Sequence, residues 1–261
     1  MPDRAPSALS AAPPIIPPDG LFDRFAARIA ALPEHTPLRR EDLLVPEFLL
    51  AADGPLELYY APFDYVNERA RVVLIGIAPG WYQAELAHRT ARDALRAGAS
   101  LAEAGERART TASFSGAIRS NLVAMLDGLG LHAALGLASC WELFGERADL
   151  LATSAVVRYP LFVRGGNYTG YGPEPLRHPL LRRFVVEALA SELARMPRAL
   201  VVPLGKSVAA SIDHLVSAGV LEAERCLPGL PHPSGANAHR PAQFAAVQPL
   251  AAARVRDWFG A

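Results

Sequence analysis

The sequence lacks an excess of charge of either sign. Its 261 residues carry 26 lysines and arginines against 26 aspartates and glutamates, so the formal net charge is zero. A basic surface over the whole protein, of the kind that coats nucleic acid, is therefore excluded. The charge is unevenly spread, however, because residues 151–210 hold eight basic and three acidic side chains, whereas residues 1–110 hold 12 basic and 15 acidic ones. Any contact with nucleic acid would be local.

Cysteine is nearly absent as well. Cys140 and Cys226 are far apart in the chain and form no CxxC pair. This excludes a disulfide framework, a zinc ribbon and a four-thiolate iron–sulfur cluster, and we expect neither a metal nor a cofactor. No apolar run approaches the roughly 20 residues that cross a bilayer. We therefore expect a cytoplasmic monomer with no membrane partner.

The N-terminal residues are rich in proline. Residues 1–18 contain no continuous apolar segment of the kind that marks a secretory signal, and their prolines disfavour both helix and sheet. We predict a mobile tail over residues 1–18 and a single domain over residues 19–261. Asp19 is a candidate N-cap for a first helix, because apolar residues recur at helical spacing after it.

Three apolar segments alternate with helical patterns in the rest of the chain. Residues 71–77, 152–157 and 199–204 are rich in Val, Ile, Leu and Ala, which is typical of strands covered on both faces. Helices are predicted at 84–109, with an interruption near Gly98, and at 115–129, 180–195, 207–218 and 242–258. The alternation predicts an α/β fold with a mostly parallel sheet, whose ligands bind at the carboxyl ends of the strands.

Two motifs follow predicted strands or lie near the C-terminus. Gly76–Gln83 reads GIAPGWYQ, which is either a turn that ends a strand or a wall that lets backbone amides approach a substrate. His232 stands between two prolines, either as an ordinary loop residue or as a stiffly held donor to developing negative charge. Gly205-Lys206-Ser207 is not a phosphate loop, because position 200 is leucine where that loop needs glycine. Ser207 is a candidate helix N-cap instead.

Taken together, five blocks resemble the uracil-DNA glycosylase superfamily, in its branch without an iron–sulfur cluster. They are GIAPG, SFSGAIRSNL, ATSAVVRYP, VVPLGKS and LPHPSGAN, in this order along the chain. The resemblance implies a three-layer α/β/α sandwich with a central, mostly parallel four-stranded sheet. It also implies an enzyme that flips uracil out of single- or double-stranded DNA and hydrolyses its N-glycosidic bond, leaving an abasic site. Two alternatives stay open: a glycosylase for hypoxanthine or xanthine, and a catalytically weak DNA-binding relative.

The resemblance also implies roles for individual residues around the base. Phe114 would stack on the base, and His232 would donate a hydrogen bond to it as the glycosidic bond breaks. Ser154 stands where an asparagine usually reads the base edge, so Asn121 or backbone amides would have to share that task. The remaining candidates for contact with the substrate come from the two motifs: Gly76, Ile77, Ala78, Pro79, Gly80, Tyr82 (as a wall against the thymine methyl group), Ser234 and Asn237.

The first motif carries no carboxylate to orient the attacking water, because Ile77 and Ala78 occupy the two positions where other branches place a polar residue. Gln83 and Glu85 are therefore the nearest candidates for handling the water, and Asp64 and Asn67 precede the strand. A dissociative reaction asks little of a base, so the missing carboxylate need not abolish activity.

The basic segment predicts where DNA binds. Arginines with interleaved tyrosines near residues 167–171 suit contact with phosphates and stacking on bases. The loop after His232 carries no large apolar side chain, and His239 or Arg240 is expected to fill the gap that an extruded base leaves. The predicted DNA contacts are Arg158, Arg164, Lys206, Ser207, Gly235, His239 and Arg240.

Overall fold

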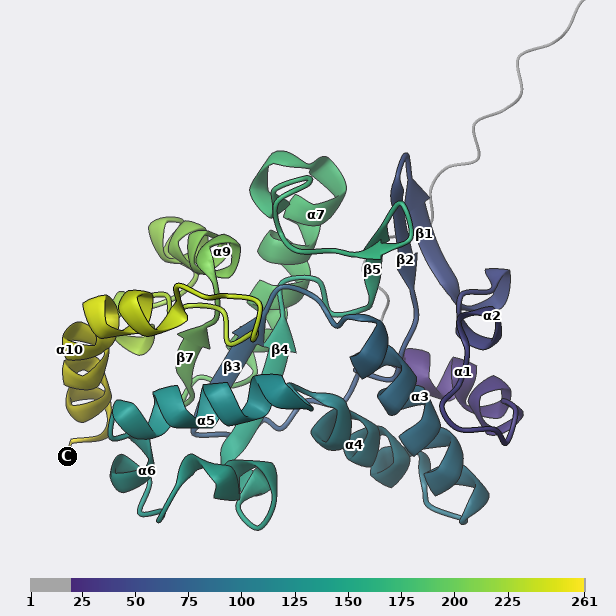
Figure 1. The fold of residues 1–261 in the computed structure, drawn as a ribbon, viewed down its shortest axis with the longest axis horizontal. Coiled ribbons are helices and arrows are strands. Elements are labelled where there is room, and N and C mark those ends of the chain that lie inside the picture. The colour runs from purple at the N-terminus through teal and green to yellow at the C-terminus, as the bar shows by residue number, and fades with distance from the viewer. Residues whose placement is uncertain (1–19, 261) are drawn as a thin grey trace, which may run out of the picture.

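The computed structural model describes residues 20–260 and contains a parallel sheet between two layers of helices (Figure 1). The predicted tail and the candidate cap Asp19 lie outside the described residues. The parallel sheet has the order β4-β3-β7, with β3 at its centre. Its strands are β3 (Val72–Gly76), β4 (Leu151–Ala155) and β7 (Leu200–Pro203).

The sheet has three strands where four were expected. A fourth segment pairs with β7 only at single parallel bridges, from Cys226 to Val201 and from Leu230 to Leu204. Pro228 lies between the two bridges, and proline has no N–H to donate to a ladder. The chain therefore follows the edge of β7 without forming a regular strand.

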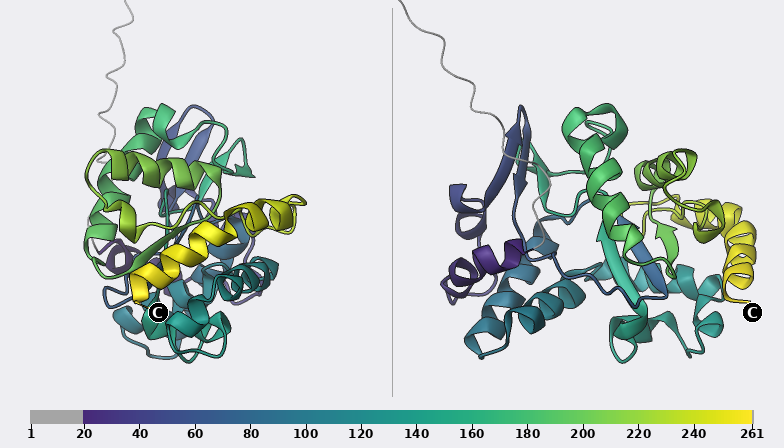
Figure 2. Two further views of the ribbon diagram at one scale, coloured as in Figure 1. Left: turned by 90° about the vertical axis from the view of Figure 1, so that its left-hand side faces the viewer. Right: turned by 180° about the vertical axis from the view of Figure 1, so that it is seen from behind.

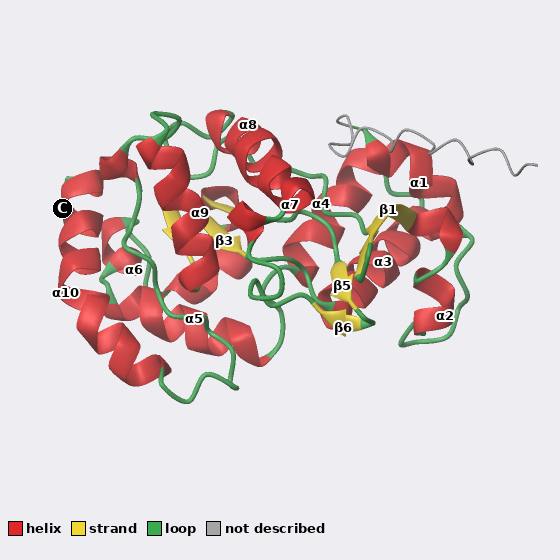
Figure 3. Ribbon diagram, turned by 90° about the horizontal axis from the view of Figure 1, so that it is seen from above, coloured by secondary structure: helices red, strands yellow, loops and turns green. Residues whose placement is uncertain are grey.

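Helices cover both faces of this sheet, which confirms the predicted α/β/α sandwich (Figure 3). On one face, Val72 and Leu74 of β3 share a core with α5 (Ala117–Gly128) and α10 (Arg240–Phe259). On the other, Val73 and Ile75 share a core with α9 (Lys206–Ser217) and with a continuous helix. This helix consists of α7 (Pro179–Arg183), the π-helical turn η5 (Phe184–Leu189) and α8 (Ala190–Ala194).

A second, antiparallel sheet lies beside the first (Figures 1 and 2). This sheet was not predicted from the sequence. Its order is β1-β2-β5-β6, and its strands are β1 (Leu49–Asp53), β2 (Leu56–Tyr59), β5 (Leu161–Val163) and β6 (Gly166–Asn167). It lies near α1 (Leu21–Ala30) and α2 (Arg40–Leu43), and its apolar side chains join the same core as one face of the parallel sheet.

The long helical pattern at 84–109 forms two helices, as the interruption near Gly98 predicted. α3 (Trp81–Arg96) ends before Gly98, whose φ of 82° lies in the left-handed region that glycine tolerates. α4 (Leu101–Ala112) then begins after Ser100, whose hydroxyl accepts a hydrogen bond from the Glu103 N–H. The remaining short helix, α6 (Leu131–Ala134), follows α5.

Two chain segments cross between the sheets, residues 60–71 and residues 156–160. They are tied together at Asp64, whose carboxylate accepts hydrogen bonds from the hydroxyls of Tyr60 and Tyr159, both at 2.7 Å. Burial raises the pKa of Asp64 even though these hydroxyls and nearby arginines favour its ionised form. Among residues 20–260, no helix is both long and apolar enough to cross a membrane.

Candidate active site

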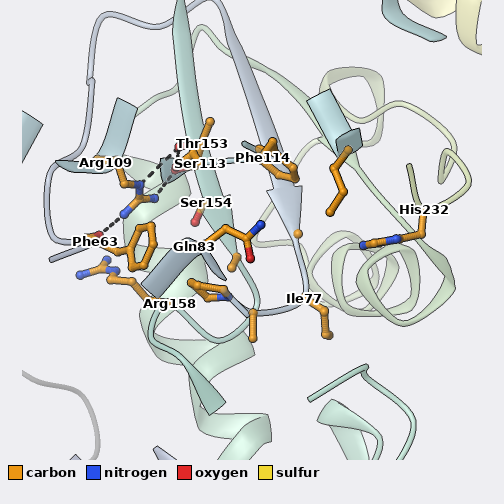
Figure 4. A pocket seen from close by; sticks show the side chains of 15 residues that line it. Phe63, Ile77, Gln83, Arg109, Ser113, Phe114, Thr153, Ser154, Arg158 and His232 are labelled. Carbon is orange, nitrogen blue, oxygen red and sulfur yellow. Dashed lines mark hydrogen bonds between the residues drawn. The ribbon is translucent and has the colours of Figure 1, made fainter. Parts of the chain in front are cut away.

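A pocket opens at the carboxyl ends of β3 and β4, where the sequence predicted the ligand (Figure 4). It holds about 580 Å³ of space that no atom fills, part of it open to solvent. The lining residues are Phe63, Gly76, Ile77, Ala78, Pro79, Gln83, Arg109, Ser113, Phe114, Ile118, Thr153, Ser154, Ala155, Arg158 and His232. Aspartate and glutamate do not occur among them.

The turn after β3 forms one wall. The carbonyl groups of Gly76 and Ile77 accept hydrogen bonds from Val156 and Val157, both at 2.9 Å, so this wall is fixed to the segment that follows β4. Gly80 then ends the turn, and its N–H donates to the Gln83 side-chain oxygen at 3.2 Å. This bond occupies the Gln83 oxygen and leaves its NH₂ group available to the pocket.

Phe114 forms a second wall between α4 and α5. It adopts a φ of 49°, which is rare for a residue other than glycine and costs about 1–3 kcal/mol. The conformation is held from both sides, since the Ser115 hydroxyl donates to Ala112 and the Arg119 guanidinium donates to Ser113. The ring lies against Gly76, with two of its atoms 3.5 Å from the place where a Cβ of Gly76 would stand.

His232 lies at one end of the pocket, opposite Arg109 (Figure 4). The backbone N–H of Ser234 donates to its Nδ1 at 3.2 Å. Nδ1 is therefore the acceptor nitrogen of the neutral ring, which places the proton on Nε2. Burial lowers the pKa of His232, so the neutral form predominates at neutral pH.

A network of hydrogen bonds holds the loop that carries His232. The side-chain amide of Asn121 donates to the carbonyl of Pro233 at 2.9 Å, and that of Asn237 donates to the carbonyl of His232 at 3.3 Å. Arg240 donates to the carbonyl of Ser234 and to the side chain of Asn121.

This network corrects four expectations. Asn121 and Asn237 do not line the pocket, and Ser234 contributes its backbone to His232 rather than a contact of its own. Arg240, expected at the DNA, directs one terminal nitrogen to Ser234 in its own loop and the other to Asn121 on α5.

Ser154 lies on β4 inside the pocket, with only 5% of its surface exposed. Its hydroxyl has no hydrogen-bond partner among residues 20–260. A buried hydroxyl without a partner costs free energy, and a bound ligand that supplies one removes that cost. Ser154 is therefore poised to bond a ligand, either as donor or as acceptor.

The far end of the pocket is built from ionised groups, of which Arg109 and Glu192 were not predicted as site residues. Arg109 donates to the carbonyl groups of Phe63 and Thr153 and forms an ion pair with Glu192 at 3.3 Å. Glu192 also accepts two hydrogen bonds from Arg158, at 2.9 and 3.2 Å. Arg158, expected at the DNA backbone, is instead a largely buried part of this pocket wall.

Other predicted water-handling residues lie away from the pocket. The Glu85 carboxylate accepts hydrogen bonds from the Leu38 N–H at 3.0 Å and from Arg89 at 2.8 Å. Asn67 donates to backbone carbonyls, including that of Asp149 at 2.8 Å, and Asp64 is held by its two tyrosines. Of the candidates, Gln83 alone lines the pocket.

Tyr82, predicted to wall the pocket against a thymine methyl group, does not line it. Its ring is 54% exposed, and one ring atom lies 3.5 Å from the place where a Cβ of Gly116 would stand. Gly80 also lies outside the lining.

The remaining predicted DNA contacts are on the surface, except Ser207. Arg164 is exposed in the turn between β5 and β6, Lys206 is the exposed first residue of α9, and Gly235 and His239 are exposed in the His232 loop. Ser207 is not the helix cap, because α9 begins at Lys206 and the cap position is Gly205. Its hydroxyl donates to the carbonyl of Gly170 at 2.9 Å instead.

Comparison with known proteins decides the family. The model of the uracil DNA glycosylase superfamily matches residues 63–251, which include every residue that lines the pocket. The chain belongs to this superfamily. It is 38% identical over 222 residues to the uncharacterized protein YoxB of Bacillus subtilis (strain 168), covering 84% of this chain and 86% of that protein. No solved structure gives a significant match. Within residues 20–260, this superfamily member groups no three His, Cys, Asp or Glu side chains that could hold a metal ion.

Proposed function

We propose that the protein is a monofunctional DNA glycosylase that takes uracil from DNA into this pocket and hydrolyses its N-glycosidic bond, leaving an abasic site. The observation that carries the proposal is His232, a neutral imidazole whose tautomer is set by the Ser234 N–H. Its Nε2–H is a fixed donor at one end of a pocket in which Phe114 offers an aromatic face.

The chemistry asks for such a donor. When the bond between the base nitrogen and C1′ breaks, its electron pair goes to the base and leaves an oxocarbenium-like sugar. A neutral imidazole donates a hydrogen bond to the oxygen on which the negative charge develops. One preorganised donor of this kind contributes about 3–4 kcal/mol. The neutral imidazole makes this hydrogen bond with its one N–H, so protonation of the second ring nitrogen is not required. The lowered pKa of His232 favours this neutral form.

Water completes the reaction by forming a bond to C1′, and the proton that it releases neutralises the departing base. The lining of the pocket offers no carboxylate to accept that proton. The Gln83 side chain and the backbone of the turn after β3 position the water instead. A cationic sugar is a strong electrophile, so positioning rather than deprotonation is the main requirement.

A second candidate substrate is another deaminated base, hypoxanthine or xanthine. The observation that favours it is Ser154, because a hydroxyl both donates and accepts and so does not select one base edge. The pocket also continues past Ser154 to Thr153 and Arg109. Uracil stays the first candidate because the superfamily match covers the whole pocket. The proposal includes action as a cytoplasmic monomer.

The test uses purified protein and oligonucleotides that contain one uracil, hypoxanthine or xanthine, each in single- and double-stranded form. Alkali then converts abasic sites to strand breaks. We expect breaks at uracil and none at thymine. Breaks at hypoxanthine or xanthine alone would move the assignment to the second candidate. DNA binding without breaks at any base would contradict the enzyme proposal.

His232→Ala provides the largest expected loss within the site. It removes the donor, so the single-turnover rate should fall at least about 100-fold. His35→Ala is the control, because that histidine is also exposed but lies outside the pocket lining and outside the predicted DNA contacts. Equal rates for the two variants would remove His232 from the catalytic step.

A further inference from the structure

Tyr171 is an aromatic side chain that the protein holds in solvent. It is 64% exposed, the largest exposed fraction among the large apolar and aromatic side chains of residues 20–260. The backbone on either side is fixed. The Tyr168 hydroxyl donates to the carbonyl of Pro173, and the carbonyl of Gly170 accepts a hydrogen bond from Ser207. The ring therefore projects from an anchored loop rather than from a loose one.

The anchor packs the residue before Tyr171 against the wall of the pocket. A Cβ on Gly170 would lie 2.9 Å from the Ser207 hydroxyl and 3.1 Å from a side-chain carbon of Ile77, which lines the pocket. Gly170 has a φ of 90°, so both its conformation and its lack of space require glycine. The residue next to Tyr171 is thus packed between the turn after β3 and the beginning of α9.

Positive charge lies next to this position. Lys206 is exposed and directly precedes Ser207, which holds the Tyr171 loop. Arg177 is exposed at the end of the same connection between β6 and α7, but it forms an ion pair with Glu174 at 2.8 Å, so Lys206 is the candidate cation. An exposed aromatic ring with a cation nearby suits a phosphate backbone with stacked bases, because the cation holds the strand and the ring stacks on a base.

The loop after His232 carries no tyrosine, tryptophan or phenylalanine, and its exposed ring is the smaller imidazole of His239. Residues 235–239 are Gly, Ala, Asn, Ala and His, and Asn237 and Arg240 are bonded within the loop. A base that leaves the duplex also leaves a gap in the stack, and unfilled gaps favour its return. Among the exposed aromatic residues of the described surface near the pocket, Tyr171 has a larger exposed fraction than Tyr82, 64% against 54%.

We propose that Tyr171 inserts into double-stranded DNA where the base has left and stacks on the neighbouring base, while Lys206 contacts the flanking phosphate. This inference rests on the proposed function. It assigns the filling of the gap to the loop between β6 and α7, and not to the loop after His232. Stacking on one base is worth about 1–3 kcal/mol.

The first experiment compares Tyr171→Ala with the unchanged protein on uracil in double- and single-stranded oligonucleotides. We expect kcat/KM to fall at least about fivefold on the duplex, which corresponds to a loss of about 1 kcal/mol, and to stay within about twofold on the single strand, where no stack has to be refilled. Tyr171→Trp should restore duplex activity. Trp141→Ala is the matched control, since Trp141 is also an exposed aromatic residue but lies on the short helix η2 (Cys140–Phe144), outside the pocket lining. Equal losses on both substrates, or no loss on the duplex, would overturn the proposal.

A second experiment does not depend on turnover. A duplex with a stable abasic analogue carries 2-aminopurine opposite the gap, and its fluorescence reports stacking in the gap. We expect the unchanged protein to alter the fluorescence at saturation and Tyr171→Ala to leave it close to that of free DNA. If the unchanged protein shows this signal but cleaves no base, the proposed function fails while the insertion stands. If it cleaves uracil and the two proteins give the same signal, the insertion fails alone.

Discussion

The two sheets of the molecule differ in what they supply to the pocket. The parallel sheet supplies the wall from Gly76 to Pro79 and Ser154, and the segment along the edge of β7 leads directly to His232. The antiparallel sheet supplies no lining residue from its own strands. It braces the wall instead, because the Asn167 side chain on β6 accepts a hydrogen bond from the Trp81 N–H at 2.9 Å. One sheet carries the proposed chemistry, and the other holds that chemistry in place.

Where the sheets meet, the protein buries a set of ionised groups. Arg109 from α4 and Arg158 from the second crossing share one carboxylate, Glu192, on α8. Burial of charge is costly unless the charges are paired, so removal of Glu192 leaves both guanidinium groups without their ion-pair partner. A substitution at this junction should therefore have the largest effect on the free energy of unfolding.

The largest expected effect on stability comes from Glu192→Leu. The free energy of unfolding should fall by about 3–5 kcal/mol, the usual result of breaking a buried ion pair from one side. Denaturant unfolding followed by circular dichroism measures this change. Glu187→Leu is the control, because Glu187 lies on the same continuous helix but forms an exposed pair with Arg183. Similar unfolding midpoints for the two variants would show that the junction is not held by this network.

Protonation of His88 at acid pH should lower the free energy of unfolding. This histidine is buried on α3 against Phe48 and Tyr60, and burial lowers its pKa from 6.5 to about 4. The unfolded chain takes up the proton near pH 6.5 and the folded chain only near pH 4. The folded state therefore gains its full stability from neutral His88 above pH 6.5. This contribution, about 3 kcal/mol, is lost as the pH falls from 6.5 to about 4.

His88→Leu should remove that share of the acid sensitivity. The measurement is the free energy of unfolding between pH 7 and pH 4 for both proteins. His239→Ala should keep the full slope, because His239 is exposed. A His88→Leu protein that loses stability as steeply as the unchanged protein would assign the acid sensitivity to other groups.

The smallest of these effects concerns the brace itself. Asn167→Ala removes the acceptor for the first N–H of α3, and loss of such an interaction at a helix N-terminus costs about 1 kcal/mol. We expect kcat/KM to fall about fivefold on single and double strands alike, which separates this variant from Tyr171→Ala. Asn167→Asp keeps an acceptor oxygen and should restore activity. Full activity of the alanine variant would mean that the antiparallel sheet does not position the wall.

The contrast between the sheets also explains what could be predicted from the sequence. The strands at 72–76, 151–155 and 200–203 are apolar and bounded by turn residues, so local pattern was sufficient. β5 and β6 have three and two residues, and Leu56 of β2 pairs with Val163 of β5, more than 100 positions away in the chain. No local pattern specifies such pairing, which arises from tertiary packing.

The pocket shows the same limit. Gly76, Phe114, Ser154 and His232 follow or belong to recognisable blocks, and all four line the pocket. Arg109 was missed because an arginine in a helix rich in alanine and charge resembles a solvated face. Its burial depends on the carbonyl groups of Phe63 and Thr153, which only the folded chain brings to it. Glu85 illustrates the reverse, since its place near the motif gave no hint that it faces Leu38.

The paired crossings between the sheets have a consequence for the rate of association. Two sheets joined by a single linker could turn about it. Here two segments join the sheets, and they are fastened together at Asp64. The same segments supply Phe63 and Arg158 to the pocket. The cost of ordering these walls is incurred when the chain folds and does not recur at each encounter with DNA. Capture of a base should therefore be limited by how often that base leaves the stack, and not by any opening or closing of the protein around it.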